Sequence, residues 1–103
     1  MAAADLGAAR VPLETAEACL GVLELAAEAA EHGNVNACTD SGVSGLLARA
    51  AVEGALLNVE INLKSLPASA DKEAVEAGLR RIQEAMGPAA RRCTDAVHTA
   101  MNA

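Results

Sequence analysis

Helix-forming residues fill this sequence in three long runs, and only two short segments interrupt them. The first interruption follows Gly33, a residue type that commonly ends helices because it adopts left-handed geometry at little cost. The second contains Pro67, which cannot continue a helix. No run alternates apolar and polar residues as a half-buried strand would. The sequence therefore predicts an all-α chain of three long antiparallel helices, at residues 2–32, about 39–65 and about 70–101.

Two prolines fall inside these predicted helices. Pro12 either kinks the first helix or begins it, because proline has no N–H for an internal hydrogen bond. Gly87 and Pro88 together should kink or break the third helix before it resumes from Ala89 to Met101. We therefore expect one or two of the three helices to be kinked.

The core must be built without aromatic side chains, because the chain contains no Phe, Trp or Tyr although 52% of its residues are hydrophobic. Helices packed through small side chains can approach one another closely. The absence of stacking platforms and a formal net charge of -6 argue against nucleic acid as a partner. At 103 residues the chain has room for one small domain, or for part of a larger one.

Cysteine spacing and hydropathy exclude several further classes of protein. Cys19, Cys38 and Cys93 show no CxxC or Cys/His spacing, so we expect reduced thiols in a helical interior and no metal site. The most apolar stretch, residues 42–63, is interrupted by five charged or amide side chains, which indicates a buried helix and not a membrane span. The first residues lack the basic start of a secretory signal, so cytoplasm is the expected compartment.

The second predicted helix has two polar sides that lie nearly opposite each other. One is an ordinary solvated stripe of charged residues that includes Arg49 and Glu53. The other places amides and a carboxylate beside small residues, which a surface stripe would not need. Its members, which project within about 40° of one direction, are Asp40, Leu47, Ala51, Gly54, Asn58 and Asn62. Because Asn lowers helix propensity and buried amides need partners, this face suggests a function.

The turn before that helix is also polar. Asn34, Asn36 and Asp40 lie where free N–H groups of the second helix would point, an arrangement that suits a polar or anionic ligand. The structural alternative is ordinary turn and capping chemistry, in which Thr39, Asp40 or Ser41 caps the second helix.

Three segments carry a resemblance to a known family. The run Gly33-Asn34-Val35-Asn36-Ala37-Cys38-Thr39-Asp40 resembles the G-N-x-N-x-x-S-D run of the formiminotetrahydrofolate cyclodeaminase and methenyltetrahydrofolate cyclohydrolase family, with Thr39 in place of the usual Ser. The residues from Ala51 to Leu63 are similar to its A-x-x-G-A-x-x-N-V-x-I-N-L stretch. Val11-Pro12-Leu13 is similar to a kinked helix of that family. The whole chain, residues 1–103, thus resembles the C-terminal half of one cyclodeaminase/cyclohydrolase domain.

The resemblance implies a helical-bundle domain that acts on a tetrahydrofolate derivative without a metal. It implies a substrate-binding role for Asn34, Asn36, Asp40, Asn58 and Asn62, with Asp40 as the candidate proton-transfer group. The glycine-rich P-G-G-G-S segment and the acidic segment with the family's presumed catalytic Asp have no counterpart here. We therefore expect a homo-oligomer or a complementary N-terminal half to complete the site.

Two alternatives remain open on the sequence. A module of the same origin could bind folate or mediate oligomerisation without turnover. An unrelated Ala-rich helical protein could mimic the motif by chance, although the joint match of the turn, Gly54, Asn58 and Asn62 disfavours this reading.

Overall fold

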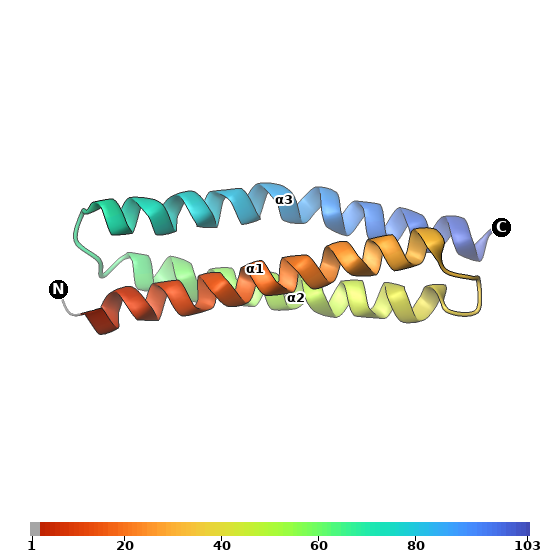
Figure 1. Cartoon of the computed structure of the whole chain (residues 1–103), viewed down its shortest axis with the longest axis horizontal. Helices are drawn as coiled ribbons and strands as arrows, with labels where there is room; N and C mark the ends of the chain where they lie inside the picture. Colours follow the sequence, from red (N-terminus) through yellow and green to blue (C-terminus); the bar gives the residue numbers. More distant parts are fainter. Residues whose placement is uncertain (1–2) are drawn as a thin grey trace.

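The computed structural model, which describes residues 3–103, contains three long helices: α1 (Ala3–His32), α2 (Cys38–Leu63) and α3 (Ala70–Met101). Consecutive helices run in opposite directions and form a rod of 55 × 18 × 16 Å (Figure 1). The start of α1 lies at the same end of the rod as the α2–α3 connection, and the C-terminus lies at the other end. The described residues contain no strand. The predicted all-α fold is confirmed.

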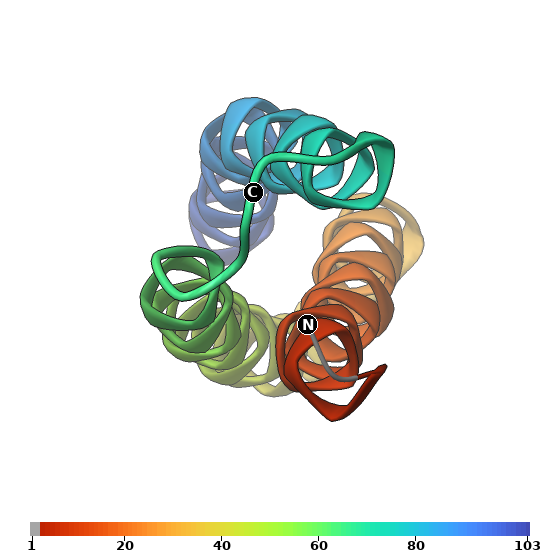
Figure 2. The ribbon, with the colours of Figure 1, turned by 90° about the vertical axis from the view of Figure 1, so that its left-hand side faces the viewer.

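The three helices surround a common axis, as the view along the rod shows (Figure 2), and their buried side chains form one core. Alanines account for much of it, and its largest fully buried side chains are Leu23, Ile82, Val52, Val59 and Val75. Cys38 and Cys93 are buried, Cys19 is half-buried, and all three are free thiols as predicted. No helix within residues 3–103 has both the length and the apolar character needed to cross a bilayer.

The start of α2 differs from the predicted cap. Helix α2 begins at Cys38, so Thr39, Asp40 and Ser41 lie within its first turn, and no side chain caps it. Asn34 orders the preceding turn instead, because its Oδ1 accepts a hydrogen bond from the Ala37 N–H at 3.1 Å. The capping role predicted for residues 39–41 is therefore wrong.

Gly33 ends α1 without left-handed geometry, since no described glycine has a positive φ. Its N–H donates to the Ala29 carbonyl at 2.7 Å, and a Cβ at this position would lie 2.6 Å from that oxygen. The predicted left-handed conformation is wrong. Glycine is needed here because the chain passes too close to the last turn of α1 for any side chain.

Both internal prolines lie within continuous helices. Helix α1 begins nine residues before Pro12, and α3 continues through Pro88 without a break. Proline has no N–H, so the carbonyl of Ala8 receives no hydrogen bond from position 12. One consequence of Pro12 is thus a backbone acceptor left available on the surface of α1.

The charged side chains join α1 to α3. Among the described residues three ion pairs occur, and each links these two helices: Arg10–Asp71, Glu17–Arg81 and Glu31–Arg92. The outer surface formed by α1 and α2 together is instead largely apolar, with Val11, Leu25, Leu47 and Leu57 each more than half exposed. The rod therefore has one charged side and one apolar side.

Candidate functional site

An open groove of about 680 Å³ lies between the first half of α1 and the last half of α2. It contains two of the amides that the sequence singled out, Asn58 and Asn62. Its lining residues are Gly7, Ala8, Val11, Pro12, Thr15, Ala51, Ala55, Asn58 and Asn62. This groove is the candidate functional site.

The α2 wall supplies two side-chain amides one turn apart. The Nδ2 of Asn62 donates to the backbone carbonyl of Asn58 at 2.8 Å, which fixes the side chain and leaves its Oδ1 as an acceptor. Within the described chain the Asn58 amide makes no hydrogen bond, and this residue is exposed. The expectation of buried amides is therefore wrong for this chain, since Asn58 faces the open groove and Asn62 is only half-buried.

The α1 wall supplies backbone and hydroxyl oxygens. Ala8 offers the carbonyl that Pro12 cannot engage. The Oγ1 of Thr15 donates to the Val11 carbonyl at 3.1 Å, so its hydroxyl oxygen can still accept a hydrogen bond. The Asn58 and Asn62 side chains of α2 and the Thr15 hydroxyl of α1 thus line the same groove.

The floor and edges of the groove are made of small residues. Gly7, Ala8, Ala51 and Ala55 have little or no side chain, so a flat ring could lie close to both helix backbones. No side chain that lines the groove is ionisable. The arrangement can therefore bind and orient a planar polar molecule, but it supplies no acid or base for proton transfer.

The predicted site residues fall into two groups that the structure keeps apart. Asn34, Asn36 and Asp40 lie at the α1–α2 turn, whereas Asn58 and Asn62 lie near the opposite end of the rod. At 1.5 Å per residue, Asp40 is about 27 Å from Asn58 along α2. The shared helix face that the projection predicted does not bring these groups to one small-molecule site.

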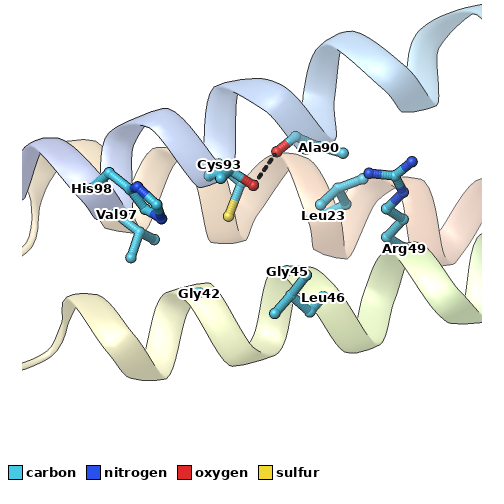
Figure 3. Close-up of a pocket in the computed structure, with 10 residues that line it drawn as sticks. Leu23, Gly42, Gly45, Leu46, Arg49, Ala90, Cys93, Val97 and His98 are labelled. Atoms are coloured by element: carbon cyan, nitrogen blue, oxygen red, sulfur yellow. Dashed lines mark hydrogen bonds between the residues drawn. The ribbon is translucent and has the colours of Figure 1, made fainter.

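A second, smaller hollow of about 130 Å³ lies between α2 and α3 (Figure 3). Cys93 forms its floor, with Arg49 and His98 at its edge. Burial raises the pKa of the Cys93 thiol, which keeps it protonated and unreactive. Nowhere in residues 3–103 do three or more His, Cys, Asp or Glu side chains cluster in a way that could hold a metal ion. We attribute this hollow to the packing of Gly45 against Cys93.

Two contributors to the groove were missed on the sequence, the Ala8 carbonyl and Thr15. The signal for the carbonyl was present, because a proline inside a helix always leaves the carbonyl four residues earlier without its usual donor. Thr15 carried no comparable signal, since only the packing of α1 beside α2 places it at the groove.

Comparisons with known proteins place this geometry in context. The family described as formiminotransferase-cyclodeaminase matches residues 1–101. A methenyltetrahydrofolate cyclohydrolase from Methylorubrum extorquens is 38% identical over 73 residues. That alignment covers 71% of this chain but only 34% of the relative, so the matched part of the chain corresponds to about a third of that protein. No solved structure matches the chain.

Proposed function

Because the chain belongs to the formiminotransferase-cyclodeaminase family, we propose that it forms one wall of a tetrahydrofolate-binding site in one-carbon folate metabolism. The observation that carries this proposal is the groove between α1 and α2, which two asparagines line together with Thr15. The similarity to a methenyltetrahydrofolate cyclohydrolase supports a folate ligand.

The groove suits the pterin ring of a folate. A pterin is flat and carries both N–H donors and carbonyl or ring-nitrogen acceptors along its edge. The Asn58 amide can serve both kinds of group, while Asn62 Oδ1 and the Ala8 carbonyl accept. The small residues Ala51 and Ala55 leave room for the ring to lie against α2.

The reaction proposed for the complete site is that of a cyclodeaminase or a cyclohydrolase. Either reaction needs proton transfer at the one-carbon centre. The groove holds the ring but offers no ionisable group, and Asp40 is about 27 Å from Asn58 along the helix. We therefore expect the acid or base beside the groove to come from a complementary N-terminal half or another subunit. Asp40, with Asn34 and Asn36, would contact a ligand only at the turn.

The second candidate function is folate binding or oligomerisation without turnover. The lack of an ionisable side chain in the groove favours it for this chain acting alone. The first candidate predicts folate binding at the groove and catalysis after complementation, whereas the second predicts no catalysis after complementation.

Calorimetric titration with tetrahydrofolate tests the binding role. Replacing a hydrogen-bonding amide by Leu costs about 1–3 kcal/mol, so Asn58→Leu should weaken binding by about 5- to 150-fold. Asn102→Leu is the control, because Asn102 is also an exposed asparagine but lies far from the groove. Equal affinity in the Asn58→Leu and Asn102→Leu variants would contradict the proposal.

Absorbance of methenyltetrahydrofolate tests turnover. The chain alone should leave the absorbance unchanged, and addition of a polypeptide carrying the N-terminal half of a related domain should start its loss. Asp40→Asn in the complemented enzyme then tests the predicted proton-transfer role, which an unchanged rate would rule out. Binding without turnover after complementation would support the second candidate.

A further inference from the structure

The hollow of about 130 Å³ between α2 and α3 shares no lining residue with the groove between α1 and α2. Its inner wall is apolar and buried, and consists of Leu23 from α1 with Ala90, Cys93 and Val97 from α3. Because burial raises the pKa of the Cys93 thiol, this wall carries no charge. A protein cavity of about 150 Å³ with apolar walls holds one benzene molecule. The hollow is therefore close to the size of one six-membered ring or a branched chain of similar volume.

The rim of the hollow is polar and exposed to solvent. Arg49 extends from α2 at one end and His98 from α3 at the other, with Cys93 between them (Figure 3). The contacts of α2 with α3 agree with this order, since a Cβ on Gly42 would lie 3.2 Å from Val97 Cγ2. Arg49 is seven residues beyond Gly42, which is about 10 Å farther along α2. A molecule in the hollow would thus contact the apolar wall with its body and Arg49 with one end.

The charge of this rim differs from that of the chain as a whole. The chain has a formal net charge of -6, yet within its described part the hollow is lined by an arginine and a histidine and by no carboxylate. The hollow beside the last turn of α1 is different, because Glu31 and Asp95 line it. The α2–α3 hollow therefore places positive charge beside an apolar wall in an otherwise acidic protein.

Arg49 is also without a partner among residues 3–103. Arg10, Arg81 and Arg92 each pair with a carboxylate across α1 and α3, whereas Arg49 forms neither an ion pair nor a side-chain hydrogen bond. Glu53, one turn later on α2, does not pair with it. The planar guanidinium of Arg49 thus keeps all its N–H donors for a ligand.

We propose that the α2–α3 hollow binds a small monocarboxylate with an apolar body of about the volume of a benzene ring. The apolar body packs on Cys93 and Val97 between α2 and α3. The carboxylate accepts hydrogen bonds from the Arg49 guanidinium, whose forked donors match the two oxygens of a carboxylate.

The placement of each group agrees with the cost of removing it from water. Burying an ionised carboxylate without a partner is costly, but Arg49 is exposed, so the carboxylate keeps part of its hydration at the rim. Only the apolar body enters the buried part of the hollow, where leaving water is favourable. A cationic ligand of the same shape would be repelled by Arg49.

This site is separate from the proposed folate site. A two-ring pterin is too large for a hollow of about 130 Å³, and the groove that we assign to it lies between a different pair of helices. The inference therefore does not rest on the proposed function.

Methyl NMR of the 103-residue chain, titrated with sodium benzoate, tests the site. The chain contains no Phe, Trp or Tyr, so ring-current shifts of methyl signals report the ring of the ligand directly. We expect saturable shifts at the Leu23 and Val97 methyl groups, with a Kd in the millimolar range for so small a ligand. Leu57, exposed on the apolar side of the rod, is the internal control and should not saturate. Unshifted Leu23 and Val97 methyl groups, or equal shifts at Leu57, would overturn the proposal.

Removal of the guanidinium tests recognition of the carboxylate. Arg49→Gln should weaken benzoate binding by at least about fivefold, because a charge-assisted pair is lost. Benzyl alcohol, which has the same ring but no charge, should bind the wild type and Arg49→Gln equally. Arg91→Gln, at an exposed and unpaired arginine of α3 outside the hollow, is the matched control and should leave benzoate affinity unchanged. Equal benzoate affinity in Arg49→Gln and the wild type contradicts the proposal.

A cross-test separates this site from the groove. Asn58→Leu should leave benzoate affinity unchanged, and Arg49→Gln should leave tetrahydrofolate affinity unchanged, since the two sites have no residue in common. Loss of benzoate binding in Asn58→Leu would place the carboxylate in the groove and refute the second site. Loss of tetrahydrofolate binding in Asn58→Leu together with no benzoate shift in the wild type would refute the second site and leave the proposed function intact.

Discussion

Gly45 illustrates how one missing side chain sets the distance between two helices. A Cβ at this position would lie 2.6 Å from the Sγ of Cys93, which is buried, so the Cys93 side chain would have to shift. The contact joins α2 to α3 beneath the smaller hollow. Gly45 therefore permits a close approach in the core, unlike Gly87, whose added Cβ would meet open space.

Gly45→Ala should lower the free energy of unfolding by about 1–3 kcal/mol, because an extra methyl group overpacks the core. Cys93→Ala removes the sulfur that it would meet, so the double variant should recover part of the loss. Gly87→Ala, the control, should gain about 0.5–1 kcal/mol from reduced backbone freedom. Urea denaturation measures the free energy of unfolding of the wild type and of each variant. Equal free energies of unfolding for Gly45→Ala and Gly87→Ala would show that Gly45 is not packed as described.

The roles of single residues were only partly predictable from the sequence. The helical projection grouped Gly54, Asn58 and Ala51 correctly on one face, and the structure leaves all three exposed. It could not show that Asp40 lies far from Asn58, because a helical projection gives the angle of each residue about the helix axis but not its distance along that axis. Nor could it show that Asn34 would order the turn with its own side chain, which displaced the predicted cap.

At the scale of the helix, the sequence located α3 better than α2. Ser69 is the N-cap of α3, and its side chain accepts a hydrogen bond from the Lys72 N–H at 3.1 Å, which is typical of a serine just before a helix. The prolines were recognised, but α1 and α3 continue through them. Packing along the whole length of each helix offsets the lost hydrogen bond, and a local rule for proline does not include that packing.

Ser69→Ala should reduce the stability of the chain by about 1 kcal/mol, because an N–H of the first turn of α3 loses its acceptor. Thr39→Ala is the matched control at the start of α2, where no side chain caps the helix. It should change stability by less than about 0.5 kcal/mol. Thermal or urea unfolding compares the two variants. A loss of stability in Thr39→Ala as large as that in Ser69→Ala would indicate that Thr39 caps α2, contrary to the structure.

At the scale of the whole molecule, Glu31 and Arg92 tie the end of α1 to α3. The Arg92 Nε donates to Glu31 Oε2 at 2.9 Å. This hydrogen bond holds the pKa of the Glu31 carboxyl below its usual value of 4.5, while desolvation acts in the opposite sense. The carboxylate form therefore stabilises the fold, and that contribution is present above pH 4.5 and is lost as the pH falls through the lowered pKa.

The stability difference between the wild type and Glu31→Gln should accordingly be present at pH 7 and shrink below pH 4.5. Salt should reduce it at pH 7, because the pair is at the surface. Glu84→Gln, at an exposed glutamate outside the described ion pairs, is the control and should show no such trend. Urea denaturation across this pH range measures the difference. A constant difference from pH 7 to pH 3 would contradict the assigned interaction.

The three-helix architecture was predictable because propensity, turn residues and apolar spacing all agree along the chain. The apolar side of the rod was predictable only as an excess of apolar positions on more than one helix face. What covers it depends on another molecule or segment, which cannot be read from the helical pattern of this chain.

The position of the groove at one end of the rod has a consequence for binding. Its α1 wall, Gly7 to Thr15, belongs to the first turns of a helix, and terminal turns open more easily than central ones. Amide protons there should exchange with solvent faster than those near Leu23. Whatever fills the groove must also hold these turns closed, so slower exchange at the start of α1 would report occupancy of the groove.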